Sequence, residues 1–168
     1  LGQLDDAVKS YEQTITIKPD YAEAHYNLGI TLQELSQLDD SVKSYKQALA
    51  IKPDYAEAHN NLGNAFRDLG QPDSALKSYK QALTIKPDFA EAHYNLGITH
   101  QGLNQLDTAV KHYEQALEIQ PDYTEAFNNL GGVLNELGQP DIAVKSYEKI
   151  LVIKPDFAEA HNNLGIAF

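Results

Sequence analysis

The side chains that could carry chemistry recur at fixed intervals along this chain. Four of the six histidines stand at one place in a 34-residue period: His25, His59, His93 and His161. His93 and His100 are seven residues apart, on roughly one face of a helix, but they lack the i, i+4 spacing of a helical zinc pair. We therefore expect the repeated histidines to pack between helices, His112 to lie in solvent, and no metal site to form.

No other residue set favours catalysis. The chain has no cysteine, which excludes thiolate zinc sites and thiol nucleophiles. Serines recur without a partnered base, and the acidic pairs Asp5-Asp6 and Asp39-Asp40 are better explained as helix starts. Because no strand is expected, there is no strand–loop–helix phosphate site either. We predict a protein that is not an enzyme and needs no cofactor.

A column of asparagines is the strongest candidate binding feature. Its members are Asn27, Asn61, Asn95, Asn129 and Asn163, with Tyr26, Asn60, Tyr94 and Asn128 beside them and Asn64 one turn away. Asparagine is a mediocre helix former, so its recurrence suggests a role. One carboxamide can donate to a carbonyl and accept from an N–H of the same peptide residue. Two interpretations stay open: the column grips an extended peptide, or it bridges adjacent repeats.

These residues are positioned by a 34-residue repeat that runs through the whole chain. Pro19, Pro53, Pro87, Pro121 and Pro155 each sit in a Lys-Pro-Asp-Tyr tetrapeptide or a close variant. Apolar residues between them follow the helical period in two segments separated by a short turn. The pattern predicts one array: a lone second helix in 1–21, full helix–turn–helix repeats in 22–55, 56–89, 90–123 and 124–157, and a lone first helix in 158–168.

Each second helix is expected to start at a recurring aspartate, such as Asp39 or Asp73, whose carboxylate would cap free N–H groups. A lysine follows each aspartate four residues later, as in Asp39 and Lys43, which favours an ion pair on the helix surface. Glycines such as Gly29 recur inside the first helices although glycine costs about 0.8–1.0 kcal/mol there, which implies a close approach. We expect the repeated tyrosines, such as Tyr45, to wedge between neighbouring helices.

The repeat resembles the tetratricopeptide repeat: 34 residues, Leu-Gly in the first helix, Ala and an aromatic in the second, and Pro at the exit. Histidine stands where that family usually has Trp. The resemblance implies an all-α, right-handed superhelical solenoid whose first helices line a concave groove. The asparagine column is similar to that of the O-linked N-acetylglucosamine transferases, where such a ladder holds an extended polypeptide. The carboxylate clamp of the chaperone-tail binders is absent, because Arg67 is the only basic residue expected on a first helix.

Charge narrows the class of partner. The formal net charge is −11, which argues against nucleic acid or an anionic membrane as the main partner. Much of the acid excess falls on the first helices, where Glu57, Glu91 and Glu125 recur, so we expect a neutral or basic peptide there. No apolar stretch approaches the roughly 20 residues of a membrane span. The sequence leaves the compartment open, with the cytoplasm as the default.

Incomplete repeats at both ends suggest a piece of a longer protein. Because each repeat buries its face on a neighbour, uncapped ends predict head-to-tail self-association. The leading function is a non-catalytic scaffold that binds an extended peptide in the groove. Two alternatives remain: a substrate-presenting arm of a larger enzyme such as a glycosyltransferase, and a self-assembly module.

Overall fold

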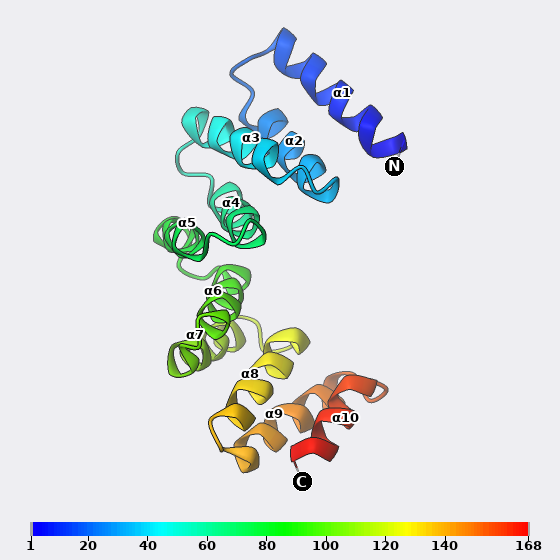
Figure 1. Ribbon diagram of the computed structural model, residues 1–168, viewed down its shortest axis with the longest axis vertical. Helices are drawn as coiled ribbons and strands as arrows, with labels where there is room; N and C mark the ends of the chain where they lie inside the picture. The colour runs from blue at the N-terminus through cyan, green and yellow to red at the C-terminus, as the bar shows by residue number, and fades with distance from the viewer. Residues whose placement is uncertain (1, 168) are drawn as a thin grey trace. The chain divides into compact units, whose positions relative to one another are not determined.

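The computed structural model describes residues 2–167, and within them it contains ten α-helices and no strand (Figure 1). The helices are α1 (Gly2–Ile17), α2 (Ala22–Glu34), α3 (Leu38–Ile51), α4 (Ala56–Asp68), α5 (Pro72–Ile85), α6 (Ala90–Gly102), α7 (Leu106–Ile119), α8 (Thr124–Glu136), α9 (Pro140–Ile153) and α10 (Ala158–Ala167). They form two compact units, Leu1–Pro87 and Asp88–Phe168. The predicted all-α class is confirmed.

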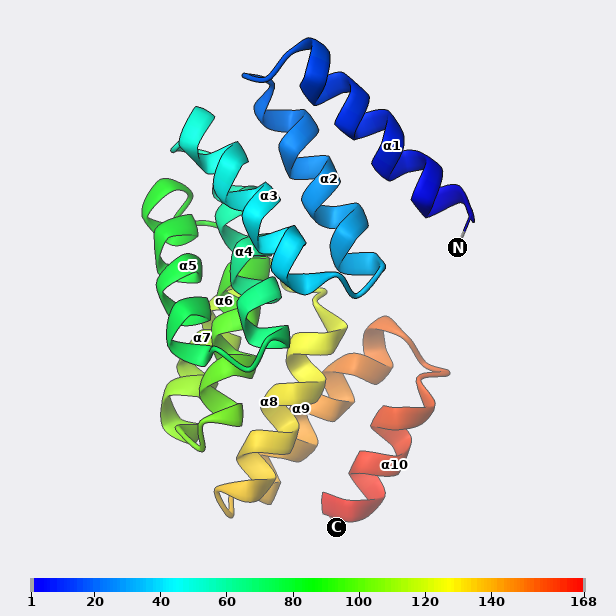
Figure 2. The ribbon, with the colours of Figure 1, turned by 45° about the horizontal axis from the view of Figure 1, so that its top comes forward.

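Each unit is a stack of helical hairpins. In the first unit α2 pairs with α3 and α4 with α5, while α1 packs on α2 and α3 packs on α4 (Figure 2). In the second unit α6 pairs with α7 and α8 with α9, while α7 packs on α8 and α9 packs on α10. Every helix therefore packs on a sequence neighbour, as the 34-residue repeat predicts, although α1 has no fully buried residue.

The hairpin turns use a single left-handed residue to end each first helix. Gly70 and Gly138 have φ of 70° and 71°, and Asn104 has φ of 57°. Ser36 takes the same conformation at φ 59° although it has a Cβ. The next N–H bonds back to the helix, as from Gln37 N to the Leu32 carbonyl at 2.8 Å, so these turns satisfy free helix-end carbonyls.

The starts of the second helices differ from our expectation in two ways. The helices begin one residue before the recurring aspartates, so Asp39 and its equivalents lie inside the first turn, and no side-chain cap bond forms at α3, α5, α7 or α9. The predicted i, i+4 ion pairs are also wrong. Lys43 Nζ instead contacts Asp40 at 2.7 Å and Lys9 Nζ contacts Asp6 at 3.2 Å, each three residues earlier. A carboxylate inside the turn still interacts favourably with the helix dipole.

Tyrosines and alanines form the core of the hairpins. Tyr45, Tyr79, Tyr113 and Tyr147 are at most 1% exposed. The small residues at their sides are fully buried: Ala48, Ala75, Ala82, Ala109, Ala116 and Ala143. The predicted wedging of these tyrosines is confirmed. Among residues 2–167, no helix combines the length and apolarity needed to cross a membrane.

Candidate functional site

The asparagine column lies on the first helices, one residue on each of α2, α4, α6, α8 and α10. Asn27, Asn61, Asn129 and Asn163 are half-buried, so part of each side chain meets solvent. Asn95 is only 5% exposed. Each column residue stands next to a leucine that packs inward, such as Leu28 beside Asn27, and this placement keeps the carboxamides at the edge of the core.

In the first unit the column makes a hydrogen bond between adjacent repeats. Asn61 Nδ2 on α4 donates to the Tyr26 hydroxyl on α2 at 3.0 Å. The Tyr26 ring is itself held by Tyr55, with ring centroids 4.8 Å apart, and by Tyr45 at 6.0 Å. The Asn61 carboxamide is therefore fixed in orientation by an aromatic cluster.

The second unit repeats this bridge with the same sequence separation. Asn129 Nδ2 on α8 donates to the Tyr94 hydroxyl on α6 at 3.2 Å, and Asn163 Nδ2 on α10 donates to Asn128 Oδ1 on α8 at 2.9 Å. The structure thus shows the bridging role that the sequence left open. Because a carboxamide has two N–H donors and two acceptor lone pairs, the bridge uses only part of its capacity.

Two of the residues predicted to line the site are buried. Asn60 is 1% exposed and its Nδ2 lies 3.4 Å from Asn61 Oδ1, and Asn95 is also buried. The shorter asparagine at position 60 stays below the surface that the longer Tyr26 and Tyr94 reach at the equivalent places. These two residues contribute almost no surface to a partner in this structure.

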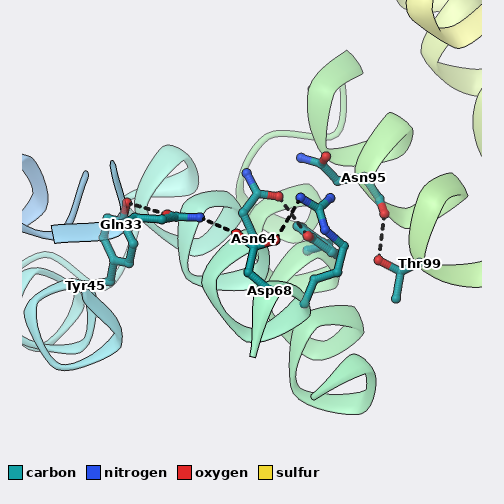
Figure 3. A network of polar contacts seen from close by, with 8 residues as sticks. Gln33, Tyr45, Asn64, Asp68, Asn95 and Thr99 are labelled. Carbon is teal, nitrogen blue, oxygen red and sulfur yellow. Dashed lines mark hydrogen bonds and ion pairs between the residues drawn. The ribbon is translucent and has the colours of Figure 1, made fainter. Parts of the chain in front are cut away.

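A second polar layer lies one to two turns further along the first helices, and of its residues the sequence predicted only Asn64. The Tyr45 hydroxyl donates to Gln33 Oε1 at 3.1 Å, and Gln33 Nε2 donates to Asp68 Oδ2 on the next first helix at 2.9 Å (Figure 3). Asn64 Oδ1 accepts the Tyr79 hydroxyl at 2.8 Å. The recurrence of glutamine at 33 and 101 was the available signal.

Acidic side chains lie beside these rows, and some of them are paired. Glu57 is 3.6 Å from Lys86 and Glu23 is 3.8 Å from Lys52, with all four side chains close to half exposed. Glu125 is exposed. Pairs so accessible to solvent are worth little, so they reduce the local negative charge without removing it.

The acidic side chains add to the effect of burial on the pKa of two nearby tyrosines. Burial raises the pKa of Tyr123, and Tyr94, Glu91 and Glu125 raise it further. Burial also raises the pKa of Tyr55, with smaller effects from Glu23 and Glu57. The charges of the glutamates at the starts of the first helices therefore reach the aromatic clusters that hold the asparagine column.

The repeated histidines hold the junctions between repeats. His25 Nε2 lies 3.0 Å from the Pro19 carbonyl oxygen, and His59 and His161 make the same contact with Pro53 and Pro155. Because a carbonyl oxygen can only accept, each ring donates from Nε2. This contact fixes the chain that enters the first helix.

The expectation for His112 was wrong. It is half-buried, its Nδ1 lies 3.4 Å from His93 Nδ1, and its ring stacks on His100 with centroids 5.4 Å apart. Packing of α7 on α6 places His112 against His93 and His100. The position of His112 on its own helix does not show this contact. In the described part of the chain no group of three His, Cys, Asp or Glu side chains is arranged to hold a metal ion.

Comparison with protein families matches residues 1–145 to one kind of repeat. A family described as TPR repeat matches residues 1–36, 34–66 and 63–104. Two families described as tetratricopeptide repeat match residues 90–123 and 112–145. Among curated protein sequences, none matches the chain.

Solved structures agree with this result. The crystal structure of MamA is 26% identical, covers 94% of this chain and 92% of its own, and has a TM-score of 0.85. TTC0263 from Thermus thermophilus, described as a thermophilic TPR protein, is 25% identical, with 99% and 91% covered and a TM-score of 0.77. YrrB, described as a TPR protein with an unusual peptide-binding site, is 22% identical, with 96% and 83% covered and a TM-score of 0.77.

Proposed function

Because this chain belongs to the tetratricopeptide repeat family, we propose that it is a non-catalytic scaffold that binds an extended polypeptide along its first helices. The family fold suggests a protein-interaction role, and the peptide-binding site of YrrB supports a peptide as the partner. The observation that carries the proposal is the bracing of Asn61 and Asn129, each fixed by one hydrogen bond to a tyrosine of the preceding repeat.

A braced carboxamide can recognise a peptide backbone. One N–H of Asn61 donates to Tyr26, and its carbonyl oxygen accepts from Asn60 Nδ2 at 3.4 Å. The second N–H and the second lone pair of the carbonyl are the groups we assign to a partner. An extended peptide presents alternating C=O and N–H groups that match this set. Since only backbone groups are read, the bound sequence is weakly specified. Fixing the side chain in advance lowers the entropy cost of binding.

The surrounding charge favours a neutral or basic peptide. Glu125 is exposed, and Glu57 is only partly neutralised by Lys86 at 3.6 Å. Charges near a binding surface mainly speed encounter and select partners by sign, and their effect is screened by salt. We therefore expect binding to weaken as ionic strength rises.

The test must separate a binding asparagine from a bridging one. We would screen the purified chain against an array of unstructured peptides and measure affinities by fluorescence anisotropy. The double variant Asn61→Ala and Asn129→Ala removes both carboxamides. Its matched control, Tyr26→Phe and Tyr94→Phe, removes the same two bridges but keeps both carboxamides.

We expect the alanine pair to weaken binding by at least about tenfold, which is about 1.4 kcal/mol, and the phenylalanine pair to weaken it much less. If both pairs lose stability equally and bind peptide like the parent chain, the asparagines only bridge repeats and the proposal is wrong. Absence of any binding peptide at low salt would contradict it as well.

A further inference from the structure

A separate cavity of about 300 Å³ lies in the first unit among α3, α4 and α5. Leu62 and Phe66 of α4 form its apolar part, and Lys46 of α3 and Lys77 of α5 stand at its sides. None of the residues predicted to bind peptide on the first helices lines this cavity. It is therefore a second place on the molecule where a ligand could be held.

The charge of this cavity is opposite to that of the chain. Lys46 and Lys77 line it and no acidic residue does, although the formal net charge is −11. Both lysine side chains are exposed at the cavity and neither forms an ion pair with a described residue. In the preceding repeat the equivalent of Lys77 is paired, since Lys43 lies 2.7 Å from Asp40.

Comparison between repeats shows why Lys77 is unpaired. Lys77 is the equivalent of Lys43 one repeat later, and the place of Asp40 is taken by Ser74. Ser74 lines the cavity, and its backbone carbonyl accepts the Ser78 hydroxyl at 2.9 Å. The change from aspartate to serine removes the carboxylate that would neutralise Lys77 and leaves a hydroxyl donor in its place.

Lys46 stands at a place where some of the other repeats carry glutamate. The equivalent residue is Glu12 one repeat earlier and Glu114 two repeats later, whereas the next repeat has Lys80. The Lys46 ammonium lies 5.4 Å from the centroid of the Phe66 ring, a cation–π distance that holds the charge over the apolar part of the cavity. The cavity thus combines two cations, polar donors from serine and glutamine side chains, and an aromatic surface.

We propose that this cavity binds an acidic segment of a partner polypeptide, with a side-chain carboxylate between Lys46 and Lys77 and an adjoining apolar side chain on Phe66 and Leu62. The chemistry fits, because a carboxylate accepts hydrogen bonds from ammonium and hydroxyl groups. About 300 Å³ is at the lower end of small-ligand sites and suits one or two side chains. This site does not depend on the function proposed for the first helices.

The test uses two blocked dipeptides as probes, acetyl-Glu-Phe-amide and acetyl-Gln-Phe-amide, titrated into the isotopically labelled chain and followed by NMR. We expect the glutamate probe to shift the backbone amides around Ser74 and Lys77. The glutamine probe should bind at least about fivefold more weakly, since it lacks the charge. Salt at about 0.3 M should reduce the difference.

Repeat-matched variants make the result specific. Ser74→Asp supplies the carboxylate that Asp40 provides to Lys43, and Lys46→Glu supplies the residue that other repeats carry at this place. Each substitution copies another repeat, so the fold should be kept, as circular dichroism would verify. We expect both to weaken the glutamate probe about tenfold. Lys80→Glu makes the same change one repeat later, outside the cavity lining, and should have little effect. Equal binding of the two probes, or equal loss in all three variants, would overturn the proposal.

Discussion

Gly29 and the ring of Tyr45 lie so close that a Cβ at residue 29 would come within 2.6 Å of Tyr45 Cε1. Gly63, Gly97 and Gly131 have the same relationship to the tyrosine sixteen residues later. The missing side chain makes room for a buried aromatic ring, whose hydroxyl then reaches the polar layer of the first helix, as Tyr45 does at Gln33. The recurring glycine is therefore a packing requirement of each hairpin.

Gly97→Ala tests this relationship. A methyl group there would lie 2.5 Å from Tyr113 Cε1, and the Tyr113 ring is fully buried and cannot withdraw. We expect the free energy of unfolding, measured by urea denaturation, to fall by about 1–3 kcal/mol. Gly132→Ala is the control, because nothing lies within 4 Å of its added Cβ. That variant should gain up to about 1 kcal/mol from helix propensity. Changes of the same sign would contradict the steric explanation.

Much of the fold could be predicted from the sequence because the information is local and repeated. The period located each hairpin, and the left-handed residues at Gly70 and Asn104 were predictable from residue type. The capping role predicted for Asp39 was wrong, because a shift of one residue at the helix start moves its side chain from the cap into the first turn. The hydrogen bond from the Ser41 hydroxyl to the Gly29 carbonyl at 2.7 Å was not predicted either, because it joins two helices.

The candidate site was predicted less completely, and the reason is geometric. The asparagine column was visible as a repeat, but its partners lie 35 residues away, and only packing of α4 on α2 shows that Asn61 meets Tyr26. Burial of Asn60 likewise depends on what neighbouring helices cover. Sequence spacing gives the helix and the approximate face, whereas exposure at that face is set by tertiary contacts.

The bridge between Tyr26 and Asn61 should be measurable as a coupling energy. In a double-mutant cycle with Tyr26→Phe and Asn61→Ala, we expect a favourable interaction of about 0.5–1.5 kcal/mol, typical of one hydrogen bond within a protein. Urea denaturation of the four proteins supplies the cycle. Asn27 is the control partner, because its side chain forms no hydrogen bond with a residue in the described range 2–167. A coupling within error of the Tyr26–Asn27 value would show that the bridge adds nothing.

Alkaline pH should weaken the fold through Tyr123. Burial and the neighbouring Glu91 and Glu125 raise the pKa of its phenol above the ordinary value of about 10. The folded protein therefore resists losing this proton more than the unfolded chain does. The resulting stabilisation is complete below about pH 10 and is lost as pH rises above it, by up to about 1.4 kcal/mol per pH unit.

Thermal melting between about pH 8 and 11 checks this prediction. Tyr123→Phe should melt like the parent at the lower end of this range and lose less stability at the upper end, because one titrating group is gone. Tyr21→Phe is the comparison, since it removes one hydroxyl from an exposed tyrosine. Identical slopes for the parent and Tyr123→Phe would mean that this phenol ionises as freely in the folded state.

The fourth full repeat lacks a hydrogen bond that the third has, and this difference predicts a stabilising substitution. In the third repeat the Tyr113 hydroxyl donates to Gln101 Oε1 at 2.8 Å. In the fourth repeat the residues at the equivalent positions are Tyr147 and Asn135. Asn135 Oδ1 is buried and has no hydrogen-bond partner among residues 2–167. Asparagine is one methylene shorter than glutamine, so it does not reach the hydroxyl. Leaving a buried acceptor unsatisfied costs about 1–3 kcal/mol.

Asn135→Gln should therefore raise the free energy of unfolding by about 0.5–1.5 kcal/mol in urea denaturation, because it restores the contact seen between Gln101 and Tyr113. The reverse change, Gln101→Asn, should lower it by a similar amount. If the gain comes from the hydroxyl, it disappears when Asn135→Gln is combined with Tyr147→Phe. A gain that survives without the hydroxyl would instead belong to the added methylene or to helix propensity, and the proposed pairing would be wrong.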